Sequence, residues 1–390
     1  LDNLNLTAAT PSAVAYGLRR LTSVYTGAAL QIRRSDGEQR DVYFDAAGGL
    51  SLTSQVSATG GGAATATTLA SWIGSNSGTV SVWYDQSGLG RNAFQTTVTA
   101  QPRLINAGVI ETQNGKPTLV FSGAQTFQTT ATTTQCVGSN TNISSNFVFQ
   151  NSTANAEMLN NGPTYRLVTS YGGSQNYIWI NNWVGTGAAL SWTGYSIGTF
   201  IKNATQTEIW KNSSNSLSAG ASGTLSGAAT MVIGSSINGR LGELTIFPSG
   251  LSTAERTALE CSQANYYAIP VLTPQIALGY ANAVSLGTTT ASLPYSYTTA
   301  TNYSITWSAA AASAGFVNVT NAVLPAATIP VAVPATGPVG GQNYAGVLTI
   351  TNNCSGLSTN YGFNIYIIGN NVLDNLNLTA ATPSAVAYGL

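Results

Sequence analysis

The chain has 390 residues, of which only 7% are charged, with 13 Lys and Arg against 13 Asp and Glu and no histidine. Zero net charge excludes the basic surfaces that bind nucleic acid or anionic membranes. No apolar run reaches the roughly 18 residues of a membrane-spanning helix. Hydrophobic residues make up 43% of the chain, which argues against disorder, and the abundant hydroxyl and amide side chains are typical of secreted surface proteins.

Residues 1–18 return without a single change at 373–390. Chance does not produce a copy of this length, and an old duplication would have diverged. The simplest interpretation is a tandem array, of which this chain holds one full repeat and the opening of another. Residues 373–390 are therefore predicted to start the next identical repeat.

Two short helices and three strands are predicted in the first hundred residues. Thr10 suits the N-cap of a short helix and Pro11 its first position. A second short helix is predicted at 65–73. Strands are predicted at 29–34 and 40–44, on either side of an Asp-Gly turn, and at 79–84, where apolar and polar residues alternate.

From residue 103 onward, short strands recur with turn residues between them, as in a two-sheet antiparallel sandwich. Ser252 and Glu255 form the capping box of a helix that is expected to continue to about Tyr267. Pro270 and Pro274 then mark a boundary, which predicts domains at 1–270 and 271–372. Examples of further predicted strands of the first domain are 117–121, 146–150, 165–169, 177–180, 207–210, 231–234 and 242–247.

Three segments of the first domain carry a family resemblance: TPSAVAYGLRRLTSVYTGAALQIRRSDGEQRDVYF, VWYDQSGLGRNAFQT and NGKPTLVFSG. They resemble the catalytic jelly roll of the arabinofuranosidase B family. The closing segment GELTIFPSGLSTAERTALECSQANYYAI is similar to the end of laminin-G and concanavalin A-like domains of bacterial surface proteins. The resemblance covers residues 1 to about 268 and implies a concanavalin A-like β-sandwich.

The second domain, 271–372, resembles the immunoglobulin-like repeats of giant type IX-secreted adhesins through ITWSAAAASAGFVNVTNAVLPAATIPVAVP and YAGVLTITNN. From Cys261 to Leu373 there is no Asp, Glu, Lys or Arg, which predicts a surface covered by neighbouring protein or by sugar. Strands are predicted at 291–297, 303–307, 328–333, 346–351 and 362–368. The predicted fold class is all-β: a concanavalin A-like β-sandwich (jelly roll) plus an Ig-like β-sandwich, in tandem repeat.

The resemblance implies two catalytic carboxylates, one on a central strand and one just after a Gly-Gly near the end of the domain. Ser235 and Ser236 stand at the second of these positions. The region 162–167, expected to carry the nucleophile, holds no acid either, and Glu157 is its nearest rival. Since a retaining glycosidase needs two carboxyl groups roughly 5 Å apart, no catalytic residue is assigned, and the chain is expected not to be an enzyme.

The other acids are assigned structural roles. Asp85 and Gln86 are expected to organise the YDQSG loop, with Asp85 accepting backbone amides. Glu260 is expected on an exposed helix face. A solvated hairpin face is expected for the acids Asp36, Glu38, Asp41 and Asp45.

No metal site and no cofactor is expected. Oxygen-ligand sites need clustered acids, and a zinc site is disfavoured in a chain without histidine. Cys136, Cys261 and Cys354 allow at most one disulfide with one thiol left over, and buried structural cysteines are the favoured interpretation.

Aromatic residues crowd the stretch YIWINNWVGTGAALSWTGY. Flat rings beside amide side chains suit a sugar, which has apolar faces and hydroxyl edges. The alternative, which is favoured, is that these aromatics fill the sandwich core. The candidate sugar-binding residues are Trp179, Asn181, Trp183, Trp192 and Tyr195.

Two classes of function follow. The favoured one is a catalytically inactive structural repeat of a long extracellular filament or surface adhesin of the Bacteroidota type, which associates with adjacent repeats and neighbouring copies. The alternative is a secreted carbohydrate-binding protein or a divergent arabinofuranosidase-like glycoside hydrolase, with glycans as partners. The exact terminal copy, the charge-free second domain and the missing acid favour the first.

Overall fold

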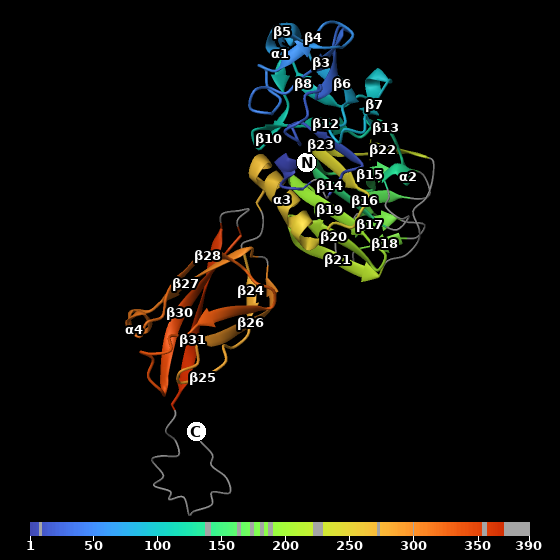
Figure 1. Cartoon of the computed structure of the whole chain (residues 1–390). Coiled ribbons are helices and arrows are strands. Elements are labelled where there is room, and N and C mark those ends of the chain that lie inside the picture. Colours follow the sequence, from blue (N-terminus) through green and yellow to red (C-terminus); the bar gives the residue numbers. More distant parts are fainter. Residues whose placement is uncertain are drawn as a thin grey trace, which may run out of the picture. The chain divides into compact units, whose positions relative to one another are not determined.

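The computed structural model describes residues 1–7, 10–136, 142–161, 165–171, 175–179, 183–185, 190–220, 229–270, 274–298, 300–352 and 357–369. Within them, only the backbone is described for 170, 171, 175–179, 183–185, 217, 218, 220 and 297. The chain forms two compact units, Leu1–Val271 and Leu272–Leu390. Both are built of β-strands (Figure 1), which confirms the predicted all-β class.

The first unit has a β-sandwich architecture, and one of its layers lies between the apolar core and helix α3 (Thr253–Tyr267). In this layer β23 pairs with β14 on one side and with β1 and β12 on the other, and the ladder continues from β14 through β19 and β20 to β21. The strands are β1 (Val14–Gly17), β12 (Leu119–Ser122), β14 (Ile143–Asn151), β19 (Ser196–Lys202), β20 (Gln206–Lys211), β21 (Ser214–Gly220) and β23 (Asn238–Phe247).

The other layer runs in the order β7, β13, β22, β15, β16, β17, β18. Aromatic side chains of the two layers meet in the core, as where Phe121 contacts Phe127 edge-on at 6.4 Å between ring centroids. The strands are β7 (Ala93–Phe94), β13 (Phe127–Thr132), β15 (Ala156–Asn160), β16 (Arg166–Tyr171), β17 (Gln175–Trp179), β18 (Trp183–Gly185) and β22 (Thr230–Ser235).

The remaining elements of the first unit form a hairpin extension and short connections. They are η1 (Asp2–Leu4), β2 (Leu30–Arg34), β3 (Gln39–Val42), β4 (Gln55–Ser57), β5 (Ala64–Thr68), α1 (Leu69–Ile73), β6 (Gly78–Trp83), η2 (Val98–Ala100), β8 (Arg103–Asn106), β9 (Val109–Ile110), β10 (Thr112–Gln113), β11 (Lys116–Pro117) and α2 (Thr133–Cys136).

The predicted helix at Thr10 is wrong, because this stretch forms β1. All four residues of β1 are buried, so the strand lacks the alternation that would have marked it. Instead of capping a helix, the Thr10 hydroxyl donates to Glu255 at 2.5 Å. The predicted helix at 65–73 is half right: its β-branched first half is strand β5, and α1 begins only after Thr68, whose side chain accepts the amide of Ser71.

Helix α3 begins at the predicted capping box, in which Ser252 and Glu255 bond each other's backbone amides. Its inner face is polar. Glu260, expected to be exposed, is fully buried there, because it faces β19 and forms a 2.7 Å ion pair with Arg256 one turn earlier. It also accepts the hydroxyl of Thr199 on β19 at 2.6 Å.

The second unit has its own core, in which Trp307 packs against Phe316 and Phe363. Its strands form one sheet in the order β24, β26, β29 and another in the order β25, β31, β30, β27, β28. The predicted strands all form, whereas the short β24, β25 and β28 escaped prediction. The elements are β24 (Ile276–Leu278), β25 (Val284–Ser285), β26 (Thr290–Thr298), β27 (Asn302–Trp307), α4 (Ala309–Ser313), β28 (Val319–Val323), β29 (Thr328–Ala332), β30 (Gln342–Thr351) and β31 (Ser358–Ile368).

No helix within the described ranges is both long and apolar enough to cross a membrane. Cys136 is buried with a free thiol, and burial raises its pKa to about 12. Cys261 is disulfide-bonded. Cys354 lies outside the described residues, as do residues 373–390.

Candidate functional site

A polar cluster lies on the non-core face of the layer formed by β22, β15 and β16. Glu157 on β15 is its centre, with a side chain that is 17% exposed. Arg166 on β16 donates from Nη1 to Glu157 Oε1 at 3.3 Å, and the amide nitrogen of Asn160 donates to Oε2. Ser235 on β22 stands directly opposite Glu157 in the antiparallel register.

A bulge in β15 positions this cluster. Met158 and Leu159 are both fully buried, whereas Glu157 and Asn160 on either side of them are partly exposed. The register towards β16 shifts between Glu157 and Leu159. Because the extra residue of a bulge resets the alternation of a strand, two polar side chains three positions apart reach the same face. That bulge gives no signal in the sequence.

The strand register continues from the polar cluster across two more strands, β17 and β18. Asn160 pairs with Arg166, Arg166 with Trp179 on β17, and Trp179 with Trp183 on β18. Two of the predicted sugar-binding positions are thus backbone neighbours of the Glu157 cluster. The side chains of Trp179 and Trp183, and all of Asn181, lie outside the described residues.

The other two predicted sugar-binding residues are core side chains. Trp192 is 1% exposed and stacks on Phe149 at 4.6 Å between ring centroids. Tyr195 is 8% exposed and meets Tyr267 of α3 edge-on at 5.7 Å. The core interpretation therefore applies to this pair, since large aromatic rings gain more from burial than from solvent.

Asp85 and Gln86 are buried at the centre of the YDQSG loop. Asp85 Oδ1 accepts the amides of Ala15 and Ser87 at 2.8 and 2.9 Å, and Oδ2 accepts the amide of Arg91 at 3.0 Å. Gln86 accepts the amide of Leu21 at 2.8 Å. These bonds hold the N-terminal segment against the loop and leave the Asp85 carboxylate facing backbone amides.

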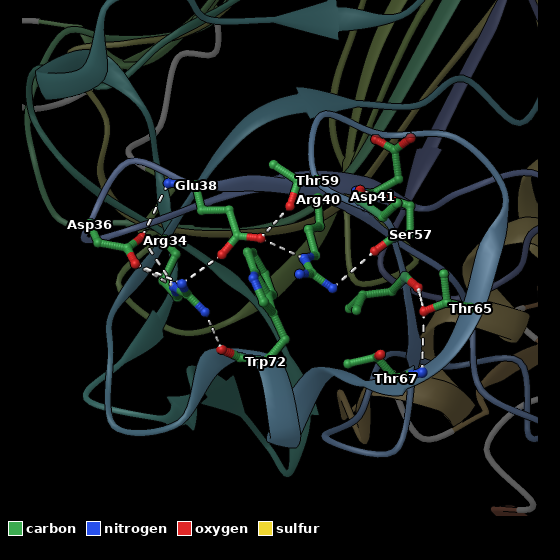
Figure 2. Close-up of polar contacts among 12 residues, drawn as sticks. Arg34, Asp36, Glu38, Arg40, Asp41, Ser57, Thr59, Thr65, Thr67 and Trp72 are labelled. Carbon is green, nitrogen blue, oxygen red and sulfur yellow. Dashed lines mark hydrogen bonds and ion pairs between the residues drawn. The ribbon is translucent and has the colours of Figure 1, made fainter.

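The acids of the β2–β3 hairpin form ion pairs rather than a reactive site (Figure 2). Arg34 bridges Asp36 and Glu38, each at 2.6 Å, and Glu38 also contacts Arg40 at 2.8 Å. Hydrogen bonds from Thr59, then from Arg40 and Trp72, lower the pKa of Glu38 to about 2. The carboxylate is therefore held ionised by its neighbours, and the cluster is structural.

Asp41 departs from the expected solvated face, because it is 7% exposed. Its carboxylate accepts the Tyr84 hydroxyl at 2.7 Å, the Gln31 amide at 3.1 Å and the Gly62 backbone amide at 2.9 Å. A charged group is buried here because each oxygen has donors. Within the described ranges, no group of three or more His, Cys, Asp or Glu residues is placed to hold a metal ion.

Comparison with known proteins gives a fold and no family. No family model matches the chain, and no curated protein matches it. Among solved structures, a family GH54 α-L-arabinofuranosidase soaked with a cyclic sulfate inhibitor aligns with a TM-score of 0.51 and 16% identity, over 74% of this chain and 73% of that one. At this identity the likeness shows the fold alone, which is the β-sandwich that the sequence resemblance implied.

Weaker likenesses are spread over unrelated activities. Domain 4 of a GH43 extracellular arabinanase from Geobacillus stearothermophilus, in complex with arabinotriose, aligns at 14% identity and a TM-score of 0.32 over 37% of this chain and 77% of that one. The botulinum neurotoxin type G receptor-binding domain aligns at 13% identity and a TM-score of 0.33 over 71% of each chain. At these scores they add nothing to the assignment.

The favoured prediction of an inactive structural repeat is corrected by these comparisons. Its strongest argument was the terminal copy, which lies outside the described residues. The fold that the chain does share is that of an arabinofuranosidase. The finding favours the alternative, a carbohydrate-active protein, over the filament or adhesin repeat.

Proposed function

We propose that the first unit binds carbohydrate on the face that carries Glu157, Asn160 and Arg166, and that it does so without hydrolysing the bound sugar. The proposal rests on the strand register. Arg166 of the polar cluster is opposite the backbone of Trp179, which is in turn opposite that of Trp183. Residues directly opposite one another in antiparallel strands share a face of the sheet. The backbone register therefore leads from a row of hydrogen-bonding groups to two tryptophan positions.

This combination matches the surface of a sugar. Hydroxyl groups exchange hydrogen bonds with a carboxylate, an amide and a guanidinium, and the apolar faces of the ring stack on tryptophan. Arabinofuranose-containing glycans are the first substrate class to test, because both the sequence resemblance and the arabinofuranosidase-like fold lead to them.

The absence of hydrolysis is argued from the neighbour of Glu157. Glycosidases of the common retaining or inverting type use two carboxyl groups that flank the glycosidic bond. Here the position beside Glu157 on β22 is Ser235, a hydroxyl. Glu157 itself is engaged by Arg166 and Asn160, which suits a binding group better than a nucleophile.

The remaining assignments belong to the same proposal. We assign the second unit to the immunoglobulin-like class, on the strength of its two sheets and of the sequence resemblance. We also place the protein outside the cell, at the surface, where a charge-poor chain rich in hydroxyl and amide groups meets glycans.

Calorimetric titration of the full chain with arabinan oligosaccharides tests the proposal. Trp179→Ala and Trp183→Ala should each weaken binding about ten-fold or more, which corresponds to the loss of about 1.4 kcal/mol of stacking. Tyr280→Ala is the matched control, because it removes a 98% exposed ring from the second unit and should leave affinity unchanged.

Two outcomes contradict the proposal. Equal affinity of all four proteins, or no binding to any glycan of an array, would remove the sugar site. Release of arabinose from aryl arabinofuranosides that disappears in Glu157→Gln would make the first unit a hydrolase instead of a binding module.

A further inference from the structure

We propose that the sugar-binding face has a second subsite at Phe94 and Gln128, and that its ligand is a neutral oligosaccharide lying across the strands. The inference rests on the proposed function, which assigns the first sugar unit to Glu157, Asn160 and Arg166. It adds a site near the other end of the same layer of the β-sandwich and a ligand that reaches from one site to the other.

The strand register connects the two sites (Figure 1). Asn160 on β15 is opposite Val232 on β22. Val232 is opposite Gln128 on β13, which is itself opposite Phe94 on β7. Residues directly opposite one another in antiparallel strands share a face of the sheet. These four residues therefore form a cross-strand row on one face of the layer.

Burial along the strands identifies this face as the one that points away from the core. On β13 buried and exposed residues alternate, and Gln128 is exposed. Val232 is partly exposed, whereas its neighbours Met231 and Ile233 belong to the core. Phe94 is also partly exposed. The cross-strand row therefore lies on the same face as the sugar site.

The cross-strand row ends in a hollow of about 140 Å³. An aromatic ring and two amide side chains contribute to its lining, from Phe94, Gln95 and Gln128, together with Thr126 and Val232. Pockets that enclose a whole small ligand are larger, at roughly 300–1,000 Å³. The hollow therefore suits one unit of a longer ligand that continues along the face.

The amide groups of the hollow are held in place before a ligand arrives. Gln95 donates to the carbonyl and the hydroxyl of Thr126 at 3.0 and 2.9 Å, and its side-chain oxygen accepts the amide of Thr97 at 2.9 Å. Gln128 donates to the hydroxyl of Thr230 at 2.8 Å. Side chains that are already ordered lose little freedom on binding. The oxygen of the Gln128 amide is thus positioned to accept a sugar hydroxyl.

The charge distribution along the face favours a neutral ligand. Among the described residues that line the hollow, none is charged. At the other site the Glu157 carboxylate is paired with the Arg166 guanidinium at 3.3 Å. Neither site therefore attracts ions of one sign. The Phe94 ring suits the apolar face of a sugar, as amide groups suit its hydroxyl edge.

The length of the face sets the length of the ligand. From β7 through β13, β22 and β15 to β16 there are four strand spacings. At about 4.8 Å each they make roughly 19 Å, a distance that several linked sugar rings span and a single ring does not. Affinity should therefore depend on the number of units in the ligand.

Calorimetric titration of the full chain with neutral arabinan oligosaccharides of increasing length tests the proposal. Wild-type affinity should rise with length until the ligand reaches from Arg166 to Phe94. For the longest oligosaccharide, Phe94→Ala should weaken binding about ten-fold through loss of the ring contact. Gln128→Ala should weaken it about five-fold through loss of one hydrogen bond. Neither change should alter the affinity for the disaccharide, which fills only the Glu157 cluster.

Two further variants separate the hollow from the first sugar site. Arg166→Ala should weaken the disaccharide and the longest oligosaccharide alike. Gln55→Ala is the matched control for Gln128→Ala, because Gln55 is also exposed on a strand, β4, which belongs to the hairpin extension. It should leave both affinities unchanged. Since Gln128 is exposed, its substitution leaves the core intact even where Phe94→Ala lowers stability.

Four results would overturn the inference. Oligosaccharides that bind with the same affinity to wild type, Phe94→Ala and Gln128→Ala at every length would leave the sugar site without its second subsite. Equal weakening of the disaccharide and the longest oligosaccharide by these two variants would show that the ligand does not lie across the strands. Tighter binding of acidic oligogalacturonides than of neutral chains would exclude a neutral ligand. Absence of binding to any oligosaccharide would remove the proposed function and this inference with it.

Discussion

Both units are built of β-strands, but they differ in their content of charged residues. All Lys and Arg residues, and every Asp and Glu except Asp374, fall before residue 261. The second unit builds both of its sheets and its aromatic core without a single ionisable carboxyl, amine or guanidinium between residues 272 and 373. Charge is therefore not what holds a β-sandwich of this kind together, and its presence in the first unit needs a separate reason.

Four charged residues of the first unit are buried where helix α3 covers the sheet: Arg19, Glu243, Arg256 and Glu260. Glu243 on β23 is fully buried, and its carboxylate pairs with Arg19 at 2.9 Å and accepts the side-chain amide of Gln263 on α3 at 2.7 Å. In the described residues of the second unit, the helix is the five-residue α4. The contrast suggests that buried ion pairs in the first unit orient α3 on the sheet, while the apolar core supplies the main stabilisation of both units.

The largest expected effect comes from breaking that pair. Glu243→Gln keeps the shape and leaves the Arg19 guanidinium buried without its counter-charge, so the free energy of unfolding of the first unit should fall by about 3–5 kcal/mol. Urea unfolding followed by hydrogen-exchange mass spectrometry reports both units in one sample. The second unit should be unchanged.

The double variant Arg19→Leu/Glu243→Leu tests the orienting role. Replacing both members of a buried pair by apolar residues often costs far less than removing one, so it should recover most of the stability that Glu243→Gln loses. If the double variant is instead as unstable as the single one, the pair supports the fold through more than its mutual charge.

The sequence predicted the positions of strands better than the burial of individual residues. Alternation located the long strands of the second unit, such as β30, in which exposed and buried residues alternate. In the first unit it located several strands, whereas others, among them β13, β15 and β19, were not predicted. Strand β1 was missed because its four residues are all buried. Glu260 was misplaced because burial of a carboxylate depends on partners contributed by β19 and by Arg256.

Only some residues of the candidate site were considered in the sequence analysis. Glu157 was weighed as a rival acid and Ser235 as a missing one, but the sequence could not show that they are register partners. That pairing depends on long-range strand order and on the bulge after Glu157. Trp192 and Trp179 looked equivalent in the sequence, although only the structure places the Trp192 ring in the core.

The next largest expected effect is that of acid, which should destabilise the first unit but not the second. The pKa of Glu38 is lowered to about 2 from an ordinary value of 4.5, and hydrogen bonds from Ser252 and then from Thr10 lower the pKa of Glu255. The unfolded chain takes up protons near pH 4.5 while these folded carboxylates stay ionised. The stabilisation from Glu38 is therefore complete above about pH 4.5 and is lost as the pH falls through about 2, and Glu255 adds a loss in the same direction.

Urea titrations between pH 6 and pH 2 measure this difference. The first unit should lose stability throughout the lower half of the range, and Glu38→Gln should flatten that loss while lowering stability at pH 6. The second unit has no carboxyl group between residues 272 and 373 to titrate. A matching acid transition in the second unit would show that its stability depends on the first.

The smallest expected effect is that of salt. The hairpin pairs of Arg34 with Asp36 and Glu38, together with the partly exposed pair of Arg103 with Glu111, lie near solvent. Pairs of this kind contribute roughly 0.2–1 kcal/mol each, and the Debye length shrinks from about 10 Å at 0.1 M to about 3 Å at 1 M salt. Raising KCl from 0.02 to 1 M should therefore lower the first unit's free energy of unfolding by about 1 kcal/mol, and Arg34→Gln should reduce this dependence. The charge-free second unit provides the internal reference and should not respond, so an equal response of both units would trace the effect to hydration rather than to ion pairs.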